Sequence, residues 1–473
     1  MFEDTLPQVF AVLVCTLSAI SDGMQYGWSA PIIPMLKSAD SPIRITETEE
    51  GYLELIYLLG GIAGLPITML LVDRVGRKGT LVCAACSSLT GWILTAAASQ
   101  VEYFYVARFC TGLAADVAFV SAPMYVAEIA DKKIRGFLAG VISIMLLIGV
   151  ILIYTIAPLV PIYASAIIGA CVLVIQLILF NFVPESPYYL LAKNRREDAE
   201  KALRKLRSNI NIEKELEEII TAVQRQRSQK SRPTDLIRVK SNRKGLIIMT
   251  VLNASQHFSS ISVMIMNLHS ILEAGNSVYI KPLPTGIIFS AVMLAAAIAS
   301  GFLMDKFGRK ILLTSSCLSA GLSLLVLAIY FTLKKSGVDV AGISWLPIVS
   351  VMVYAAVFRF GLGMVPLVLT SELFPANVKA IGMTISDAMY LIFALISVNL
   401  YHFLGKHYGL DVPFYIFAGS CLFTATFCVL YIPETKGKTL DEIQFILKGE
   451  PYPGKEMTEL QKMNVPEDQT DVA

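Results

Sequence analysis

Charged residues are scarce in this sequence. Asp, Glu, Lys and Arg make up 16% of the 473 residues, whereas 55% are hydrophobic. A soluble globular protein carries about 25% charged residues. The deficit argues against a soluble domain and indicates that lipid is the solvent for most of the chain.

Disulfide and redox signatures are also missing. All eight cysteines fall in apolar runs, which argues against a disulfide framework. The spacing of Cys83 and Cys86 fits a redox or metal motif, but no second Cys or His pair accompanies it. We therefore expect these two cysteines to be small helix-packing residues.

Signals for secretion and catalysis are lacking as well. The first eight residues include Glu3 and Asp4 and have no basic n-region, so they do not form a secretory signal. No nucleophile–base pair, metal-ligand cluster or phosphate-binding loop stands out. We therefore expect no enzyme, and no cofactor, metal or nucleic-acid partner.

Twelve apolar runs are long enough to cross a membrane, which takes about 20 residues as a helix. Six precede a charged central stretch and six follow it. The predicted spans are 9–31, 51–72, 80–98, 103–128, 136–157, 161–183, 246–272, 284–304, 311–333, 345–370, 378–404 and 412–432. The predicted fold class is an all-α membrane protein with twelve transmembrane helices in two pseudo-symmetric halves.

The charged central stretch separates the two halves. Apolar residues recur three or four positions apart in 198–206 and 212–223, which predicts short amphipathic helices. The stretch is either a solvated spacer or a helical cluster that closes against both halves. The predicted domains are an N-terminal bundle (1–183), a helical linker (184–245), a C-terminal bundle (246–433) and a tail (434–473).

Basic residues predict the orientation in the membrane. Most of the 39 Lys and Arg residues lie in the linker, the tail and the loops on the same side as both termini. Positive residues favour the cytoplasmic side of a membrane. We therefore expect both termini and the linker in the cytoplasm.

One short motif occurs at the same place in each half. Residues 73–78 read DRVGRK after the second span, and residues 305–310 read DKFGRK after the eighth. Gly permits the tight turn, and Arg can donate two hydrogen bonds to a carboxylate. Each half also ends on a Pro-Glu pair, at 184–185 and 433–434. Two repeats with a site between them are the design of carriers that open to each side of the membrane in turn.

Several longer phrases carry a family resemblance. They are Arg108 with Gly112, Pro123-x-Tyr125-x-x-Glu128-Ile129 followed by Arg135-Gly136, PESPYYLL at 184–191, Glu372-Leu373-Phe374-Pro375 with Lys379, and PETKGKTL at 433–440. With these phrases the sequence resembles the sugar porter family of the major facilitator superfamily over nearly its whole length. Trp28-Ser29-Ala30-Pro31 and PESPYYLL are most similar to the insect trehalose and glucose facilitators.

The resemblance implies an inner gate made of charged residues. In the two halves these residues would be Arg74, Arg77, Glu128, Arg135 and Glu185, and Asp305, Lys306, Arg309, Glu372, Lys379 and Glu434. Pairs that must part in one conformation should be only moderately strong, which partial exposure favours. The alternative is that these residues merely anchor loops at the lipid headgroups.

The sequence departs from the family pattern where a sugar would bind. The seventh span reads QHFSSIS at 256–262, where the family has Gln-Gln-x-Ser-Gly-x-Asn, and Asn267 stands where a Tyr is usual. Leu367 replaces a Trp, and Tyr390-Leu391 replaces Asn-Trp. The predicted substrate-binding residues are Gln256, His257, Ser262, Ser143, Tyr390 and Asp387. Such a set can bind a polyol, but not by the usual glucose contacts.

Proton coupling depends on the first and fourth spans. Proton-coupled relatives carry an Asp in the first helix that pairs with the Arg early in the fourth. Here that Arg is Arg108, but Gln25 stands at the Asp position. Asp22 lies one helical turn earlier and either pairs with Arg108 as a structural clamp or loads a proton. We predict the clamp, and hence a uniporter.

The predicted function is facilitative transport of a sugar, trehalose or a hexose, across the plasma membrane by alternating access, with a monomer as the working unit. A proton-coupled sugar or polyol symporter and a non-transporting sugar sensor of the same fold are the alternatives. A sensor can lose the paired motifs, and this sequence keeps them. Transport is therefore the favoured hypothesis.

Overall fold

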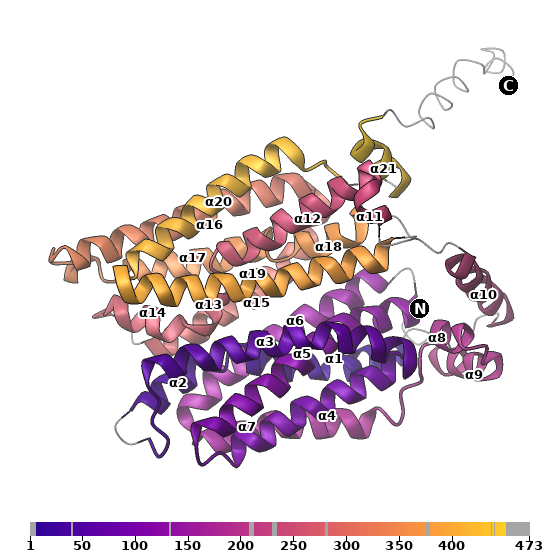
Figure 1. Cartoon of the computed structure of the whole chain (residues 1–473), viewed down its shortest axis with the longest axis horizontal. Coiled ribbons are helices and arrows are strands. Elements are labelled where there is room, and N and C mark those ends of the chain that lie inside the picture. The colour runs from indigo at the N-terminus through magenta and orange to yellow at the C-terminus, as the bar shows by residue number, and fades with distance from the viewer. Residues whose placement is uncertain are drawn as a thin grey trace, which may run out of the picture.

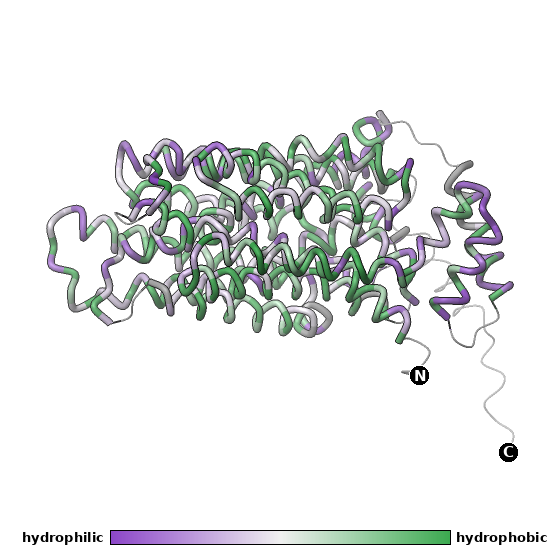
Figure 2. The backbone as a smooth tube through the Cα atoms, turned by 90° about the horizontal axis from the view of Figure 1, so that it is seen from below, coloured by the Kyte–Doolittle hydropathy of each residue, from purple (hydrophilic) through white to green (hydrophobic). Residues whose placement is uncertain are grey.

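The computed structural model describes residues 6–38, 41–131, 134–207, 212–228, 234–279, 282–374, 378–436, 438 and 440–450. These residues form helices and turns, with no strand among them. Twelve helices, or runs of adjacent helices, are long and apolar enough to cross a membrane, at the places predicted for the twelve spans. Hydrophobic residues dominate the middle of the bundle, and hydrophilic residues gather towards its ends (Figure 2). The predicted fold class is confirmed.

The N-terminal half is the indigo and purple bundle of Figure 1. Within it α3 and α4 pack along α5, and α1 packs along α6. Glycine allows α1 and α6 to approach closely, because a Cβ atom on Gly149 would lie 2.0 Å from the carbonyl oxygen of Ile20. The helices are α1 (Leu6–Tyr26), α2 (Ser29–Lys37), α3 (Glu47–Arg74), α4 (Gly76–Ala96), α5 (Val101–Ile129), α6 (Arg135–Ile156) and α7 (Ile162–Leu179), with a 3₁₀ turn at Ala157–Leu159.

The C-terminal half is the second bundle, in which α16 packs along α17 and α20. Contacts of α19 with α3, and of α15 with α6, join this half to the first. Its helices are α12 (Lys240–Phe258), α13 (Ile261–Met266), α14 (Leu268–Gly275), α15 (Pro282–Phe307), α16 (Arg309–Lys335), α17 (Leu346–Phe360), α18 (Val365–Leu373), α19 (Lys379–Tyr408) and α20 (Asp411–Tyr431), with a 3₁₀ turn at Ala341–Ile343.

Three of the predicted spans are interrupted rather than continuous. The first breaks between α1 and α2, at Gly27 and Trp28. The seventh breaks between α12 and α13, where Ser260 adopts a left-handed conformation with φ of 77°. The tenth breaks between α17 and α18, over Gly361 to Met364. Broken helices free backbone polar groups at membrane depth, and such groups are tolerated where protein or a wet site satisfies them.

The linker forms short helices at the end of the bundle where the N-terminus lies (Figure 1). They are α8 (Pro187–Ala192), α9 (Arg196–Leu206), α10 (Ile212–Ser228) and α11 (Asp235–Arg238), and the tail begins with α21 (Leu440–Lys448). The amphipathic helices predicted at 198–206 and 212–223 are therefore confirmed. Leu190, Leu203 and Leu216 belong to one apolar cluster that holds α8, α9 and α10 together. Arg207 fastens this cluster to the N-terminal half by donating to the carbonyl of Ile129 over 2.9 Å.

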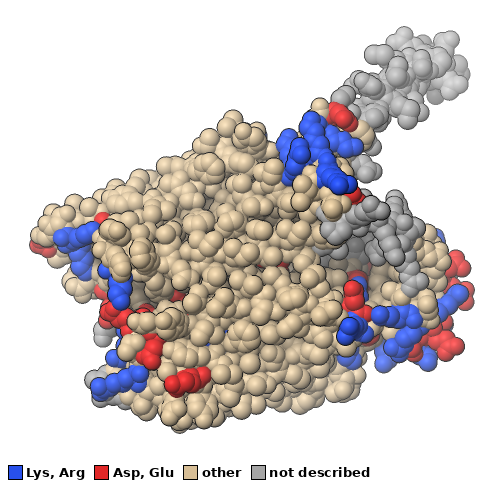
Figure 3. Space-filling model, in the orientation of Figure 1, with Lys and Arg blue, Asp and Glu red and all other residues tan. Residues whose placement is uncertain are grey.

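Charged side chains gather at the two ends of the bundle, and the surface between them is almost free of charge on the face shown in Figure 3. We call the end that carries the N-terminus, the linker helices and α21 the linker end. We call the opposite end, which carries α2 and the start of α3, the far end.

Candidate transport site and its gates

The first copy of the duplicated motif is a glycine turn capped by a carboxylate. Gly76 has φ of 87°, a conformation that favours glycine. A Cβ atom there would lie 2.4 Å from Oε2 of Glu185. The same carboxylate accepts the backbone N–H of Lys78 over 3.1 Å. Glu185 therefore caps the N-terminus of α4, where a negative charge is favourable.

The second copy repeats this geometry. Gly308 has φ of 86°, and a Cβ atom there would lie 2.6 Å from Oε2 of Glu434. The Glu434 carboxylate accepts the backbone N–H groups of Arg309 and Lys310, each over 3.0 Å. Partial burial acts to raise the pKa of Glu434, but the N–H groups of Lys436, Arg309 and Lys310 and the Arg309 charge outweigh it, so the pKa lies below its usual value. The sequence repeat is thus a structural repeat.

Arg77 holds the linker ends of α4 and α5 together. Its Nε and Nη2 groups donate to Oε1 of Glu128 over 3.0 and 2.8 Å. The hydroxyl of Ser186 donates to the other carboxylate oxygen of Glu128. Both side chains of the ion pair are about 15% exposed. Two of the predicted gate residues are therefore paired, and the Pro-Glu corner of the linker takes part in this contact through Ser186.

Arg309 forms the matching pair in the C-terminal half. Its Nη2 donates to Oε1 of Glu372 over 3.0 Å, and Thr435 donates to the other oxygen of that carboxylate over 2.6 Å. Thr435 thus takes the place that Ser186 has in the first half. Each corner residue follows its own capping glutamate directly in the chain.

The structure describes fewer contacts for the other predicted gate residues. The backbone carbonyl of Arg74 accepts a hydrogen bond from the hydroxyl of Tyr189 over 2.7 Å. The carbonyl of Lys306 accepts the ammonium of Lys436 over 2.8 Å. The side chains of Arg135, Asp305 and Lys379 lie outside the described residues.

Three predicted substrate residues come together between the two halves. Nδ1 of His257 lies 2.9 Å from the hydroxyl of Ser262, and the ring of His257 lies edge-on to Tyr390 with centroids 4.2 Å apart. The N-terminal half contributes Tyr26, whose hydroxyl lies 2.9 Å from that of Ser262, and Phe119, which stacks on Tyr390. A hydrogen-bonded chain and an aromatic wall therefore bridge both halves.

The other three predicted substrate residues have different surroundings. Gln256 donates to the carbonyl of Leu362 over 2.6 Å and so supports the break between α17 and α18. The carboxyl group of Asp387 contacts that of Asp116 on α5, and its Oδ2 atom is buried without a hydrogen-bond partner. Ser143 is half-buried on α6 and takes no part in the contacts of the His257 cluster.

The predicted pairing of Arg108 with Asp22 is not formed. Arg108 donates to the carbonyl of Gln25 over 2.6 Å and to its side-chain oxygen over 3.3 Å. It also donates to the carbonyl of Leu53 over 3.2 Å, and its guanidinium lies 4.2 Å from the centroid of the Tyr57 ring. Carbonyl groups of α1 and α3 thus satisfy this cation. Asp22 is buried, and the described residues offer it no hydrogen bond or ion pair.

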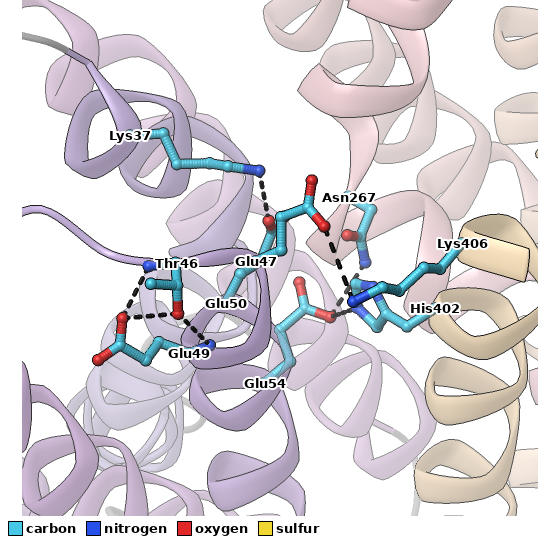
Figure 4. A network of polar contacts seen from close by, with 9 residues as sticks. All are labelled: Lys37, Thr46, Glu47, Glu49, Glu50, Glu54, Asn267, His402 and Lys406. Carbon is cyan, nitrogen blue, oxygen red and sulfur yellow. Dashed lines mark hydrogen bonds and ion pairs between the residues drawn. The ribbon is translucent and has the colours of Figure 1, made fainter.

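A polar network closes the far end across the two halves (Figure 4). Oε2 of Glu54, a fully buried residue of α3, accepts Nε2 of His402 over 2.8 Å and Nδ2 of Asn267 over 3.1 Å. Nearer the end, Glu47 and Lys406 approach to 3.9 Å, and both are exposed. His402 and Lys406 lie four residues apart on α19, so they present the same face to α3.

Loss of the His402 side chain should open the far end. The His402→Ala variant leaves the buried Glu54 carboxylate without one donor, and we expect closure of the far end to weaken by about 2 kcal/mol. The measurement is hydrogen exchange of α13 and α14, which should become faster. Lys406→Ala is the control, because an exposed pair contributes about 0–1 kcal/mol. Equal exchange in the two variants would show that the Glu54 contact does not hold this end.

Sequence reasoning missed Tyr26, Glu54 and His402. A signal for the far-end network was present, because Glu47, Glu50 and Glu54 form one stripe on α3, and His402 and Lys406 form another on α19. Nothing in a single sequence indicates that these two stripes face each other. Tyr26 gave no signal, since one Tyr near the end of a span is common at a membrane interface.

Two related six-helix halves that meet around buried polar side chains define a multi-helix membrane carrier. The chain belongs to the sugar (and other) transporter family, whose model matches residues 11–447. It is similar to the facilitated trehalose transporter Tret1 of Culex quinquefasciatus, with 28% identity over 93% of this chain and 86% of that protein. The Tret1 protein of Anopheles gambiae is 27% identical over 93% of this chain and 56% of its own length.

Solved structures share the fold. The xylose transporter XylE from E. coli in an inward open conformation superposes with a TM-score of 0.75 and 22% identity, covering 92% of this chain and 98% of that one. The proton:xylose symporter XylE bound to 6-bromo-6-deoxy-D-glucose gives a TM-score of 0.73 and 23% identity, covering 92% and 99%. This chain spans little more than half the length of some of the Tret1 relatives it matches.

Proposed function

We propose that this chain carries a sugar across the plasma membrane by facilitated diffusion, with trehalose or a hexose as candidate solutes and a monomer as the working unit. The observation that carries the proposal is the chain from Tyr26 through Ser262 to His257, beside the ring of Tyr390. Hydroxyl, imidazole and aromatic groups suit the hydroxyls and the C–H face of a sugar. Because both halves contribute side chains to this site, a movement of one half relative to the other would change the contacts of a bound solute.

In this proposal the linker end faces the cytoplasm, as the distribution of Lys and Arg favours. The inner gate is formed there by Arg77 with Glu128 and by Arg309 with Glu372. The network around Glu54 is the outer gate. The names of the Tret1 relatives favour trehalose as the first solute to test.

Uptake by purified protein in lipid vesicles tests the proposal. The panel holds radiolabelled trehalose, glucose, xylose and a linear polyol, with empty vesicles as the control. We expect saturable uptake of at least one sugar, which stops when the gradient is dissipated. Saturable binding without uptake would instead identify a sugar sensor.

Uptake should not depend on a proton gradient. The position from which proton-coupled relatives pair an Asp with this arginine is Gln25 here, and Arg108 donates to Gln25 instead of to a carboxylate. We therefore expect the rate to be insensitive to a proton ionophore and nearly constant between roughly pH 5.5 and 7.5.

A proton-coupled carrier is the second candidate. It is favoured by Asp22, which is buried without the Arg108 contact that would keep it ionised, and by the interaction between the carboxyl groups of Asp116 and Asp387 from opposite halves. Alkalinisation outside the vesicles during uptake would establish it. Loss of that signal in Asp22→Asn would place the proton at Asp22, and loss in Asp387→Asn would place it at the carboxyl pair.

A further inference from the structure

Arg359 on α17 is a buried cation that pairs with no carboxylate in the part of the chain that the structure describes. Its side chain is only 9% exposed, and its Nε–H group is buried without a hydrogen-bond acceptor. It forms none of the ion pairs among the described residues. A guanidinium group does not lose its proton in a protein. The positive charge therefore stays in the bundle interior.

Arg108 shows what a satisfied arginine looks like in the same protein. It is also buried, yet backbone carbonyls of Gln25 and Leu53 accept its hydrogen bonds, and the rings of Trp28 and Tyr57 cover it. The described residues offer Arg359 no such set of acceptors. Leaving a buried charge unpaired costs several kcal/mol, so an acceptor from outside the chain would stabilise the protein.

The described groups that act most strongly on the charge of Arg359 are phenols rather than carboxylates. Its charge interacts with the side chains of Tyr390, Tyr26 and Tyr354. These phenols are neutral at physiological pH, so they supply no negative charge. The hydroxyl of Tyr354 is itself buried without a hydrogen-bond partner. A solute anion that reached Arg359 would supply the negative charge that no described residue gives it.

Arg359 lies near the site proposed for the sugar, because Gln256, the chain neighbour of His257, donates to the carbonyl of Leu362, three residues after Arg359. Tyr26 and Tyr390 belong to both groups, because Tyr26 contacts Ser262 and Tyr390 packs on His257. His257 adds a ring nitrogen, Nε2, that is buried without a partner. Unsatisfied buried polar atoms indicate a ligand or an ordered water. Two such atoms here are Nε of the cationic Arg359 and Nε2 of His257.

We propose, on the basis of the function proposed above, that the preferred solute is a sugar acid whose carboxylate binds Arg359 while its hydroxyls meet Tyr26, Ser262 and His257. A guanidinium group binds a carboxylate through two parallel hydrogen bonds, stronger than those between neutral groups. A neutral hexose leaves Arg359 without an anion, and a sugar acid does not. The charge on the solute is therefore the specificity determinant.

Competition in vesicles tests this inference on the unaltered protein. Uptake of labelled glucuronate and labelled glucose is measured at equal concentration, and each unlabelled sugar is added to the other. We expect glucuronate to enter at least about tenfold faster and to compete at a concentration at least tenfold lower, as one charge-assisted pair implies. Galacturonate and galactose form a second matched pair, which separates the effect of charge from that of hydroxyl stereochemistry.

Substitution of Arg359 then links the preference to this residue. Arg359→Gln should lower the ratio of glucuronate to glucose uptake at least about tenfold. Arg359→Lys should lower this ratio less, because lysine keeps the charge but lacks the planar group that forms two parallel hydrogen bonds. Thermal unfolding in detergent reports whether each variant is folded. If Arg359→Gln does not fold, the competition result on the wild type still decides the question.

Two results would overturn the inference without touching the proposed function. Glucose uptake that ignores a hundredfold excess of glucuronate would show that Arg359 does not select an anionic solute. Sugar uptake that requires chloride but ignores glucuronate would show that a small ion satisfies Arg359. Absence of uptake for every sugar, acidic or neutral, would instead contradict the proposed function itself.

Discussion

Replacing either Arg77 or Arg309 with Ala should lower the initial rate of sugar uptake at least about tenfold, because each variant removes the charged one of the two partners that a partly buried carboxylate now has. Glu128 would keep only Ser186, and Glu372 would keep only Thr435. A shift of about 1.4 kcal/mol in the balance between conformations suffices for that factor. The amount of protein in the membrane should be unchanged, since neither pair lies in the apolar core.

The experiment compares uptake rates at equal surface expression. Arg195→Ala is a suitable control, because Arg195 also forms an ion pair at the linker end, with Asp198, but both side chains are about half exposed. Exposed pairs contribute little, so this variant should transport normally. Wild-type rates in both the Arg77 and the Arg309 variant would show that the two pairs only anchor loops.

Replacing Gly149 with Val should abolish the folded carrier. The first atom of any side chain at Gly149 would lie 2.0 Å from the carbonyl oxygen of Ile20 and 2.9 Å from its carbonyl carbon. Backbone atoms cannot give way as a flexible side chain can, so α1 and α6 would have to separate. Overpacking of a close helix contact costs typically 1–3 kcal/mol and more where backbone must move. We expect the variant to be absent from the monodisperse peak in size-exclusion chromatography.

Gly140 provides a matched control on the same helix. A Cβ atom at Gly140 would meet nothing within 4 Å, so Gly140→Val introduces the same side chain into open space. This variant should elute as wild type does. Comparable loss of both variants would attribute the effect to Val in α6 rather than to the contact with α1.

The fold could be predicted from the sequence because few backbone structures can span a lipid bilayer. An apolar run of about 20 residues in a membrane must satisfy its own backbone, and a helix does so. The interruptions at Ser260 and at Gly361 to Met364 were not predicted, since a hydropathy pattern does not record where helices break. The linker helices were predicted correctly because their apolar positions recur at helical spacing.

The candidate site was only partly readable. His257, Ser262 and Tyr390 were named from positions matched to a family, and the structure brings them together. Gln256 donates to a backbone carbonyl instead, which no side-chain pattern could reveal. The predicted contact of Arg108 with Asp22 is wrong because spacing along one helix fixes a face but not which neighbour a long side chain prefers. Arg108 donates instead to a backbone carbonyl, that of Gln25.

The two carboxylate-capped glycine turns also have a genetic consequence. In each copy the glycine has φ near 87° and faces a glutamate so closely that one added methyl group would collide with it. Alleles that damage the carrier should therefore occur as mirrored pairs, with Gly76 matched by Gly308 and Glu185 matched by Glu434. A saturation screen scored for growth on a transported solute would reveal this as two glycine hot spots 232 codons apart and two glutamate hot spots 249 codons apart.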